Sequence, residues 1–219
     1  YDWHILKSKS FAIPNICVGN LNLGGTGKTP HIEYLVRLLS EKYRIAVLSR
    51  GYGRKTKGYV LANDSHNHYD IGDEPMQYFK KFNDIKVAVD ENRCKGIEKL
   101  LKENQPPQII LLDDAYQHRK IKPGLNILLT DYYNLYSNDH LVPAGNLRDI
   151  RKAAKRADII VVSKSPNVLT PYYKKDVEDS LKPLPHQKIF YSYIHYGLFP
   201  IFKTFFFSYF AFRQHFFAP

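Results

Sequence analysis

Cysteine is scarce in this sequence, and long hydrophobic runs are missing from it. Its two cysteines, Cys17 and Cys94, fall on segments that we predict as strand and helix, which is not the pattern of a disulfide framework. We expect both thiols to be apolar core side chains in a protein of a reducing compartment. No apolar run reaches the ~18 residues that cross a bilayer, and no signal-peptide pattern opens the sequence. A membrane segment upstream of Tyr1 remains open.

Acidic residues are the minority among the charges. Lys and Arg number 32 against 21 Asp and Glu, which gives a formal net charge of +11. Such an excess predicts an anionic partner, which could be a nucleotide, a nucleic acid or the negative face of a membrane. With 219 residues, of which 44% are apolar, the chain can bury one good core. We therefore expect one globular domain and part of a second at most.

Apolar runs alternate with helical patterns along the chain, which is typical of an α/β fold with a mostly parallel sheet. Most of the runs are continuous rather than alternating, as in strands covered on both faces. Strands are predicted over 15–19, 44–49, 86–89, 108–112, 126–130 and 158–163, and amphipathic helices over 28–42 and 91–103. The fold class expected is a P-loop NTPase-like three-layer sandwich.

A glycine-rich turn follows the first of these strands. The eight residues of this predicted phosphate loop are Asn22, Leu23, Gly24, Gly25, Thr26, Gly27, Lys28 and Thr29. Between a strand and a helix, such a turn aims backbone N–H groups and the helix dipole at one point. Lys28 can then reach the β- and γ-phosphates of a nucleotide, and the Thr29 hydroxyl can bind Mg²⁺. Asn22 replaces the usual first glycine, which we attribute to the tolerance of Asn for left-handed backbone.

Two acidic residues close the apolar run 109–112. Asp113 or Asp114 can hold the Mg²⁺ shell, directly or through water. Without the phosphate loop, a capping aspartate would be the simpler interpretation. Together the two features predict a nucleotide site and leave open a kinase, an ATPase switch and a GTPase. Leu23 weakens one class, because membrane-cycling partition-type ATPases usually carry a lysine at that position.

Further polar stretches follow along the chain, and the first of them, a glycine-punctuated basic loop, lies at the carboxyl end of a strand, where ligands of open α/β sheets bind. They are "SRGYGRKTKGY" at 49–59, "GDEPMQYF" at 72–79, "VDENR" ending at Arg93, "DDAYQHRKI" with His118, and "LVPAGNLRD" ending at Asp149. Each has a simpler interpretation. Asp73 and Glu74 could be helix N-terminal carboxylates, Arg93 a surface cation, and His118 a packed loop residue. "HNHYD" at 66–70 lacks a second ligand motif, so we take it as a solvated loop rather than a metal site.

These stretches together resemble the tetraacyldisaccharide 4′-kinase family, the lipid A 4′-kinases of Gram-negative bacteria. The resemblance rests on "VGNLNLGGTGKTP", "LSRGYGRKTKG", "GDEPMQ", "LDDAYQHRKI", "LVPAGNLRD" and "VVSKSP", which are collinear and cover roughly residues 1–165. Each motif is weak alone, and together they are quite specific.

The resemblance implies transfer of the γ-phosphoryl group of ATP, with Mg²⁺, to the 4′-hydroxyl of a tetraacylated glucosamine disaccharide 1-phosphate. It implies work at the cytoplasmic face of the bacterial inner membrane, on an anionic surface, with no nucleic acid partner. Asp73 matches the family's proposed general base, and Lys28, Arg93 and His118 complete the implied catalytic set. The implied metal set is Thr29, Glu74, Asp113, Asp114 and Asp149. Arg148 matches a further supporting position, and Asp149 stands where the family more often has Glu.

Family members are longer than this chain. They begin with an apolar N-terminal helix and continue into a smaller second lobe whose histidine pairs with the catalytic aspartate. We assign 1–196 to the nucleotide-binding kinase lobe and 197–219 to an aromatic-rich tail, which is either a membrane-interface segment or non-native sequence. With the second lobe largely missing, we expect nucleotide binding to persist and transfer to fall below the ~1–100 per second of typical kinases. A P-loop ATPase or binding module that controls a membrane or protein contact is the alternative function.

Overall fold

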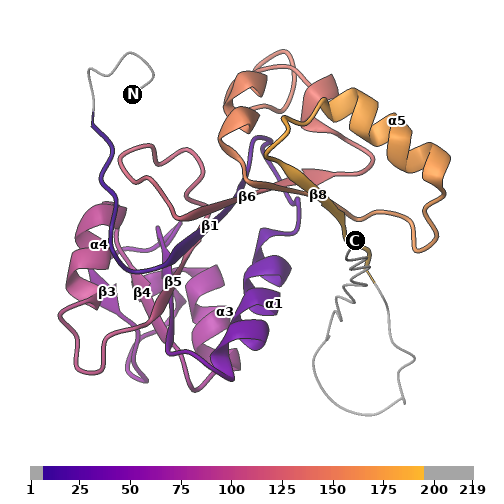
Figure 1. Cartoon of the computed structure of the whole chain (residues 1–219). Helices are drawn as coiled ribbons and strands as arrows, with labels where there is room; N and C mark the ends of the chain where they lie inside the picture. The colour runs from indigo at the N-terminus through magenta and orange to yellow at the C-terminus, as the bar shows by residue number, and fades with distance from the viewer. Residues whose placement is uncertain (1–6, 195–219) are drawn as a thin grey trace, which may run out of the picture.

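The fold is built on one eight-stranded sheet (Figure 1). The computed structural model describes residues 7–194, so the tail assigned to 197–219 lies outside the described residues. The strands are β1 Asn15–Asn20, β2 Ile45–Ser49, β3 Val60–Leu61, β4 Lys86–Val89, β5 Ile109–Asp113, β6 Leu125–Asp131, β7 Ile159–Ser163 and β8 Lys188–Tyr191. Their order is β3-β4-β2-β5-β1-β6-β7-β8, and every neighbouring pair is parallel except β3 with β4.

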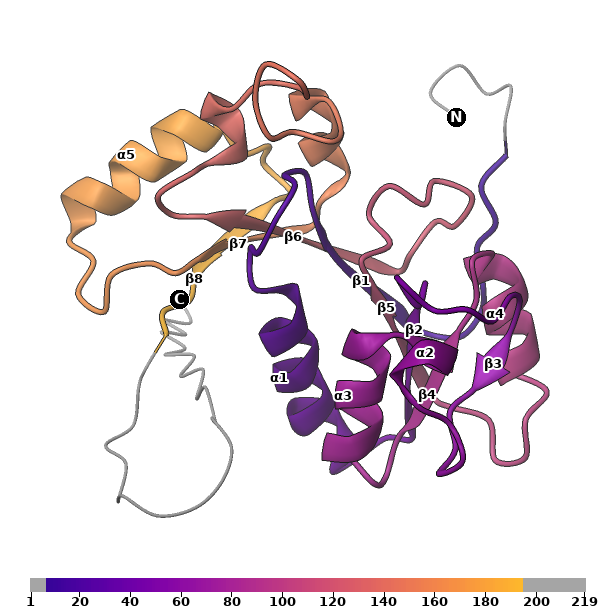
Figure 2. The same ribbon diagram turned by 180° about the vertical axis from the view of Figure 1, so that it is seen from behind.

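Helices cover both faces of the sheet (Figure 2). They are α1 Lys28–Ser40, α2 His68–Ile71, α3 Asp73–Lys81, α4 Arg93–Leu100 and α5 Pro171–Leu181, with 3₁₀ helices η1 Tyr136–Asn138 and η2 Arg151–Arg156. Successive strand residues point to opposite faces. Val18 therefore packs in one core with Ile32 of α1 and Tyr78 of α3, whereas Cys17 packs in the other. That second core also holds residues of α4, η2 and α5. The three-layer sandwich is confirmed.

The strand order places β1 between β5 and β6, at the centre of the sheet. The chain leaves β1 for α1 and β2, and β2 pairs with β5 rather than with β1. The loop after β1 therefore emerges at the carboxyl edge, beside the ends of β5 and β6. Ligands of open parallel sheets bind at this edge.

The six predicted strands are all present, with ends that shift by a residue or so. Two strands, β3 and β8, were missed. β3 has only two residues, and β8 is an edge strand that alternates between exposed and half-buried positions. Helix α5 was missed as well, although Thr170 caps its start and Pro171 follows as its first residue. Between residues 7 and 194, no helix is long and apolar enough to cross a bilayer.

The stretch "HNHYD" departs from the predicted loop by one helical turn. Asn67 and Asp70 form a capping box at the start of α2, in which each side chain binds the backbone N–H of the other. Most of the stretch is solvent-exposed. Across the described part of the chain, no group of three or more His, Cys, Asp or Glu side chains is arranged to hold a metal. That this stretch is not a metal site stays a prediction.

Candidate functional site

The phosphate loop joins the end of β1 to the start of α1. Gly24 and Gly27 have φ angles of 107° and 81°, and Gly27 is the N-cap of α1. These left-handed positions favour glycine. Asn22 is not among the positive-φ residues, so our explanation for its presence was wrong. Its side chain instead donates from Nδ2 to Asp139 Oδ2 over 2.9 Å, which ties the loop to the segment after β6.

Asn20, the last residue of β1, organises the inside of this loop. It is fully buried, and its Nδ2 donates to Thr26 Oγ1 at 2.9 Å and to the Gly24 carbonyl at 3.2 Å. Its Oδ1 accepts from Arg148 Nη2 at 2.5 Å and from Lys28 Nζ at 3.5 Å. Asn20 was not among the site residues predicted from the sequence. A polar residue that ends an otherwise apolar strand next to a glycine-rich turn was the available signal.

Lys28 and Arg148 meet the same carboxylate. Lys28 Nζ lies 3.9 Å from Asp114 Oδ1. Arg148 donates two hydrogen bonds to the same carboxylate, from Nη1 to Oδ2 over 3.0 Å and from Nη2 to Oδ1. Burial alone would raise the pKa of Asp114. The hydrogen bond from Arg148 and the charge of Lys28 outweigh it, so this pKa lies below its usual value. In this arrangement Lys28 is held by protein oxygens at the mouth of the loop.

Asp113 is the most unusual carboxyl group of the site. It is fully buried at the end of β5, and burial, together with the nearby charges of Glu74 and Asp114, raises its pKa to about 7. Tyr78 donates a hydrogen bond to its Oδ2 over 3.3 Å, while its Oδ1 has no partner among the described residues. A buried carboxylate oxygen without a partner is costly, which marks a position suited to a cation.

The residues present fit Mg²⁺. The Thr29 hydroxyl donates to Glu74 Oε1 over 3.3 Å, and the charge of Glu74 reaches Asp113, so hard oxygen donors gather beside the phosphate loop. Mg²⁺ is usually held by one or two carboxylates together with substrate phosphates and water, rather than by a protein cage. The predicted ligand Asp149 is not part of this group. It accepts hydrogen bonds from Arg156 at 3.2 Å and from the backbone of Ile150.

Arg93 is buried rather than a surface cation. It is only 2% exposed, and it donates to the carbonyl oxygens of Asp90 at 2.8 Å and Asp113 at 3.3 Å. Burial lowers its pKa to about 10. The guanidinium therefore joins the ends of β4 and β5 behind the carboxylates.

His118 is half-buried on the turn after β5, and burial and the charge of Arg93 lower its pKa. Its Nε2 has no partner among the residues described.

Asp73 is the first residue of α3 and is exposed to solvent. Within residues 7–194 its carboxylate makes no hydrogen bond or ion pair, in contrast to its neighbour Glu74. It follows Gly72, whose φ of 93° and close approach to the Tyr52 carbonyl leave no space for a side chain. This tight turn points the start of α3 toward the same sheet edge as the phosphate loop.

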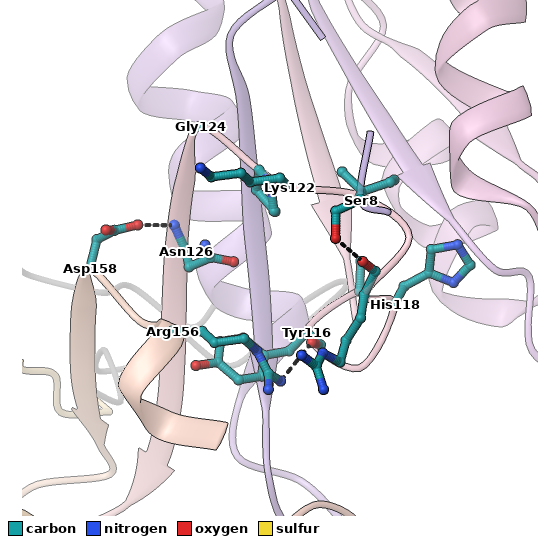
Figure 3. A pocket seen from close by; sticks show the side chains of 12 residues that line it. Ser8, Tyr116, His118, Lys122, Gly124, Asn126, Arg156 and Asp158 are labelled. Atoms are coloured by element: carbon teal, nitrogen blue, oxygen red, sulfur yellow. Dashed lines mark hydrogen bonds between the residues drawn. The ribbon is translucent and has the colours of Figure 1, made fainter. Parts of the chain in front are cut away.

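A well-formed cavity lies away from the phosphate loop (Figure 3). It has a volume of about 400 Å³, and its lining includes Ser8, Tyr116, His118, Arg156 and Asp158. Asp158 stands at the amino-terminal end of β7, so the cavity extends away from the carboxyl edge. Of the predicted site residues only His118 borders it. The residues of the phosphate loop do not line this cavity.

Comparison with known proteins gives consistent matches. The family model described as tetraacyldisaccharide-1-P 4′-kinase matches residues 1–190. The tetraacyldisaccharide 4′-kinase of Flavobacterium johnsoniae is 56% identical over 198 residues, 90% of this chain and 58% of that protein. The tetraacyldisaccharide 4′-kinase of Bacteroides fragilis strain YCH46 is 52% identical over 198 residues, which are 90% of this chain and 53% of that protein. The chain spans about half the length of the curated relatives that it matches.

A solved structure matches as well. LpxK from Aquifex aeolicus, crystallised in complex with ATP, superposes with a TM-score of 0.73 at 35% sequence identity. The match covers 90% of this chain and 59% of that one. The α/β sandwich with its phosphate loop after β1 is therefore an architecture that this kinase shares.

Proposed function

Because the chain belongs to the tetraacyldisaccharide-1-P 4′-kinase family, we propose that it transfers the γ-phosphoryl group of ATP to the 4′-hydroxyl of a tetraacylated glucosamine disaccharide 1-phosphate. The observation that carries the proposal is the convergence at one sheet edge of Lys28, Asp114 and the Thr29–Glu74 pair. Phosphoryl transfer needs alignment and charge neutralisation more than covalent help from the protein. These residues offer both.

Residues 22–29 are the proposed ATP-binding loop. Lys28 Nζ lies 3.5 Å from Asn20 Oδ1 and 3.9 Å from Asp114 Oδ1. A modest side-chain movement would bring this ammonium group to the phosphates of ATP bound in the loop. Arg148 remains on Asp114 when Lys28 leaves and keeps that carboxylate neutralised. The site is therefore preorganised, because little rearrangement is needed for charge stabilisation.

Thr29, Glu74, Asp113 and Asp114 are the residues that we propose around Mg²⁺. One or two of these carboxylates would bind the ion directly, and Asp114, which stays paired with Arg148, would act through water. The ion, when bound, would neutralise phosphate charge. Asp149 could join them only after leaving Arg156. Arg93 is proposed as a positioning residue for the end of β5, since it donates to the Asp113 carbonyl. His118 lies four residues beyond Asp114 and is proposed to meet the acceptor.

Asp73 is the proposed general base. As the 4′-oxygen of the acceptor forms its bond to the γ-phosphorus, the bond from that phosphorus to the β,γ-bridging oxygen breaks and ADP leaves. The proton of the 4′-hydroxyl passes to the Asp73 carboxylate. Solvent exposure and the lack of partners among the described residues leave this carboxylate available to an incoming hydroxyl.

The proposed setting is the cytoplasmic face of the bacterial inner membrane, where an acidic glycolipid would be met on an anionic surface. A net charge of +11 supports this setting. No nucleic acid partner is proposed. The proposed organisation keeps residues 1–196 as the kinase lobe and 197–219 as a separate tail.

The test is transfer of labelled γ-phosphate from ATP and Mg²⁺ to a tetraacyl disaccharide 1-phosphate in detergent. The variant is Asp73→Asn, and the matched control is Asp84→Asn, an exposed aspartate just beyond the other end of α3. We expect slow, acceptor-dependent labelling that Asp73→Asn abolishes and Asp84→Asn retains. Bound ATP without transfer would overturn the proposal, and hydrolysis indifferent to the acceptor would favour an ATPase module.

A further inference from the structure

Large apolar side chains stand exposed beside the phosphate loop. We call Leu23, Leu141, Val142, Pro143, Ala144 and Ile150 the apolar rim. Leu23 is 55% exposed, Leu141 45%, and Val142 and Ile150 50% each, while Pro143 and Ala144 are also exposed. Most of the rim belongs to the segment between η1 and η2, which projects from the top of the molecule in Figure 2. A concentration of exposed apolar residues on a protein surface marks an interaction site.

The rim is held rigidly, so its exposure does not come from a loose loop. The buried Asp139 carboxylate accepts from the backbone N–H groups of His140 at 2.8 Å and Asn146 at 3.0 Å, as well as from Asn22. A side chain at Gly145 would collide with Asp139. Val142 is further paired with Leu147 through a backbone hydrogen bond of 3.0 Å. This scaffold holds the segment in a conformation in which Leu141 and Val142 are exposed.

Exposed cations flank the rim on η2. Arg151, Lys152 and Lys155 are all exposed, and Arg151 donates from Nε to the Asp139 carbonyl over 2.7 Å, which fixes η2 against the same scaffold. Within the described residues, the ammonium groups of Lys152 and Lys155 have no carboxylate partner. Apolar tips bordered by basic residues match the interface of an anionic bilayer, where acyl chains lie beneath phosphate groups.

We propose that the apolar rim inserts into the interfacial zone of an anionic bilayer while the cations of η2 contact lipid phosphates. The inference deepens the proposed function and rests on it, because an acylated acceptor would lie in that bilayer. A second copy of the chain is a poorer occupant. A symmetric contact through the rim would bring two sets of Arg151, Lys152 and Lys155 together, and like charges repel.

The contacts of the rim extend this proposal to the phosphate loop. Leu23 belongs to both features, and its backbone N–H donates to the Asn146 carbonyl over 2.6 Å. Asn22 and Leu147 pair in an antiparallel bridge. A bilayer seated on the rim would therefore lie against the mouth of the nucleotide site, where the head group of a membrane-embedded acceptor can reach the γ-phosphate.

The test places an environment-sensitive fluorophore at Val142→Cys in a Cys94→Ser background. Cys17 is fully buried and stays unlabelled. The matched control carries the label at Leu101→Cys, an exposed residue at the opposite edge of the sheet. Vesicles of phosphatidylglycerol and phosphatidylethanolamine are added, some with acyl-chain-brominated lipids. We expect a several-fold rise in emission and quenching by bromine at position 142, and neither at 101.

Equal responses at both positions, or vesicle binding without a response at 142, would overturn the proposal. So would no vesicle binding at all. A rise at 142 without vesicles, growing with protein concentration, would assign the rim to self-association instead. These readouts need no phosphate transfer, so failure of the kinase assay and failure of the membrane proposal are distinguishable.

Charge and apolar variants give an independent readout by vesicle sedimentation. Lys152→Glu with Lys155→Glu should weaken partition about fivefold or more for each cation, the ratio that ~1 kcal/mol per basic residue represents. The control is Lys42→Glu with Lys102→Glu, the same charge change on exposed lysines at the opposite edge. Leu141→Asp should weaken binding and Leu38→Asp, on α1, should not. If the test and control variants lost vesicle binding equally, the effect would come from net charge alone, and the proposed membrane site would be overturned.

Discussion

Buried polar side chains at the two edges of the sheet differ in whether their hydrogen-bonding atoms have partners. In residues 7–194, six buried side-chain atoms lack a hydrogen-bond partner, and they belong to Asn22, Arg54, Arg93, Asp113, His118 and Arg148. All six residues lie at or beyond the carboxyl ends of strands. At the amino edge the corresponding groups are paired. Asp158 accepts from the backbone of Asn126 at 2.7 Å, and Asn15 from that of Gly124 at 3.1 Å.

This contrast shows which edge is built for stability and which for a ligand. Buried polar groups in folded proteins are nearly always paired, and local rules are broken where function requires it. At the amino edge, polar side chains cap the strands and complete the backbone hydrogen bonding. At the carboxyl edge they leave donors and acceptors free, next to the phosphate loop. Substitutions at the two edges should therefore differ in kind.

The largest effect is expected from Arg148→Ala. It leaves the half-buried Asp114 without its paired donor and removes one donor from Asn20. Because both side chains of the pair are partly exposed, the cost should be about 1–2 kcal/mol, or roughly 2–8 °C in Tm. Thermal unfolding with and without ATP and Mg²⁺ measures it.

Asp158→Ala, at the amino edge, is the comparison for that variant. It should lower the Tm while leaving the stabilisation by ATP unchanged, whereas Arg148→Ala should reduce that stabilisation. If both variants lose the ATP effect equally, the distinction between the edges is wrong.

An intermediate effect on the Tm is expected from the titration of the Asp113 carboxyl group. Its pKa of about 7 lies above the ordinary 3.8, so the folded chain binds this proton more tightly than the unfolded chain. The stabilisation is complete below 3.8 and is lost as the pH rises through about 7. Asp113→Asn should therefore flatten the fall in Tm over this interval and raise the Tm of the nucleotide-free chain above pH 7.

Melting curves across that pH range check the expectation for Asp113. Asp158→Asn is the control from the amino edge and should keep the slope, because Asp113 still titrates in it. An unchanged slope in Asp113→Asn would show that another group accounts for the pH dependence.

The smallest effect is expected from Asn22→Gly, which restores the usual first glycine of a phosphate loop. The substitution deletes the 2.9 Å hydrogen bond to Asp139 and should cost about 1 kcal/mol. Chemical denaturation measures the change in the free energy of unfolding. A stabilising result would mean that Asn22 serves the backbone conformation after all, contrary to its φ angle.

Much of the fold could be predicted because its signals are local. Continuous apolar runs identified the six buried strands, and the glycine-rich turn identified the phosphate loop. β8 was not predicted because an edge strand exposes one face and therefore lacks a continuous apolar run. β3 was not predicted because its two residues are too few to form a pattern. Of the site, Lys28, Thr29 and the pair Asp113–Asp114 follow from their spacing around a strand end. Arg93 was ambiguous, since sequence cannot tell a buried arginine from an exposed one.

The sequence by itself determined the layers of this protein, the position of its phosphate loop and its family, since each depends on residues close together along the chain. Only the tertiary structure decided that Asn20, Asp114 and Arg148 share one network around Lys28, and that Asp139 holds an apolar rim against the phosphate loop. The contacts that close these networks, Asn20 with Arg148 and Asn22 with Asp139, join residues that are 128 and 117 positions apart in the chain. They exist because parallel strands bring their carboxyl ends to one edge, and no local pattern records which loops meet there.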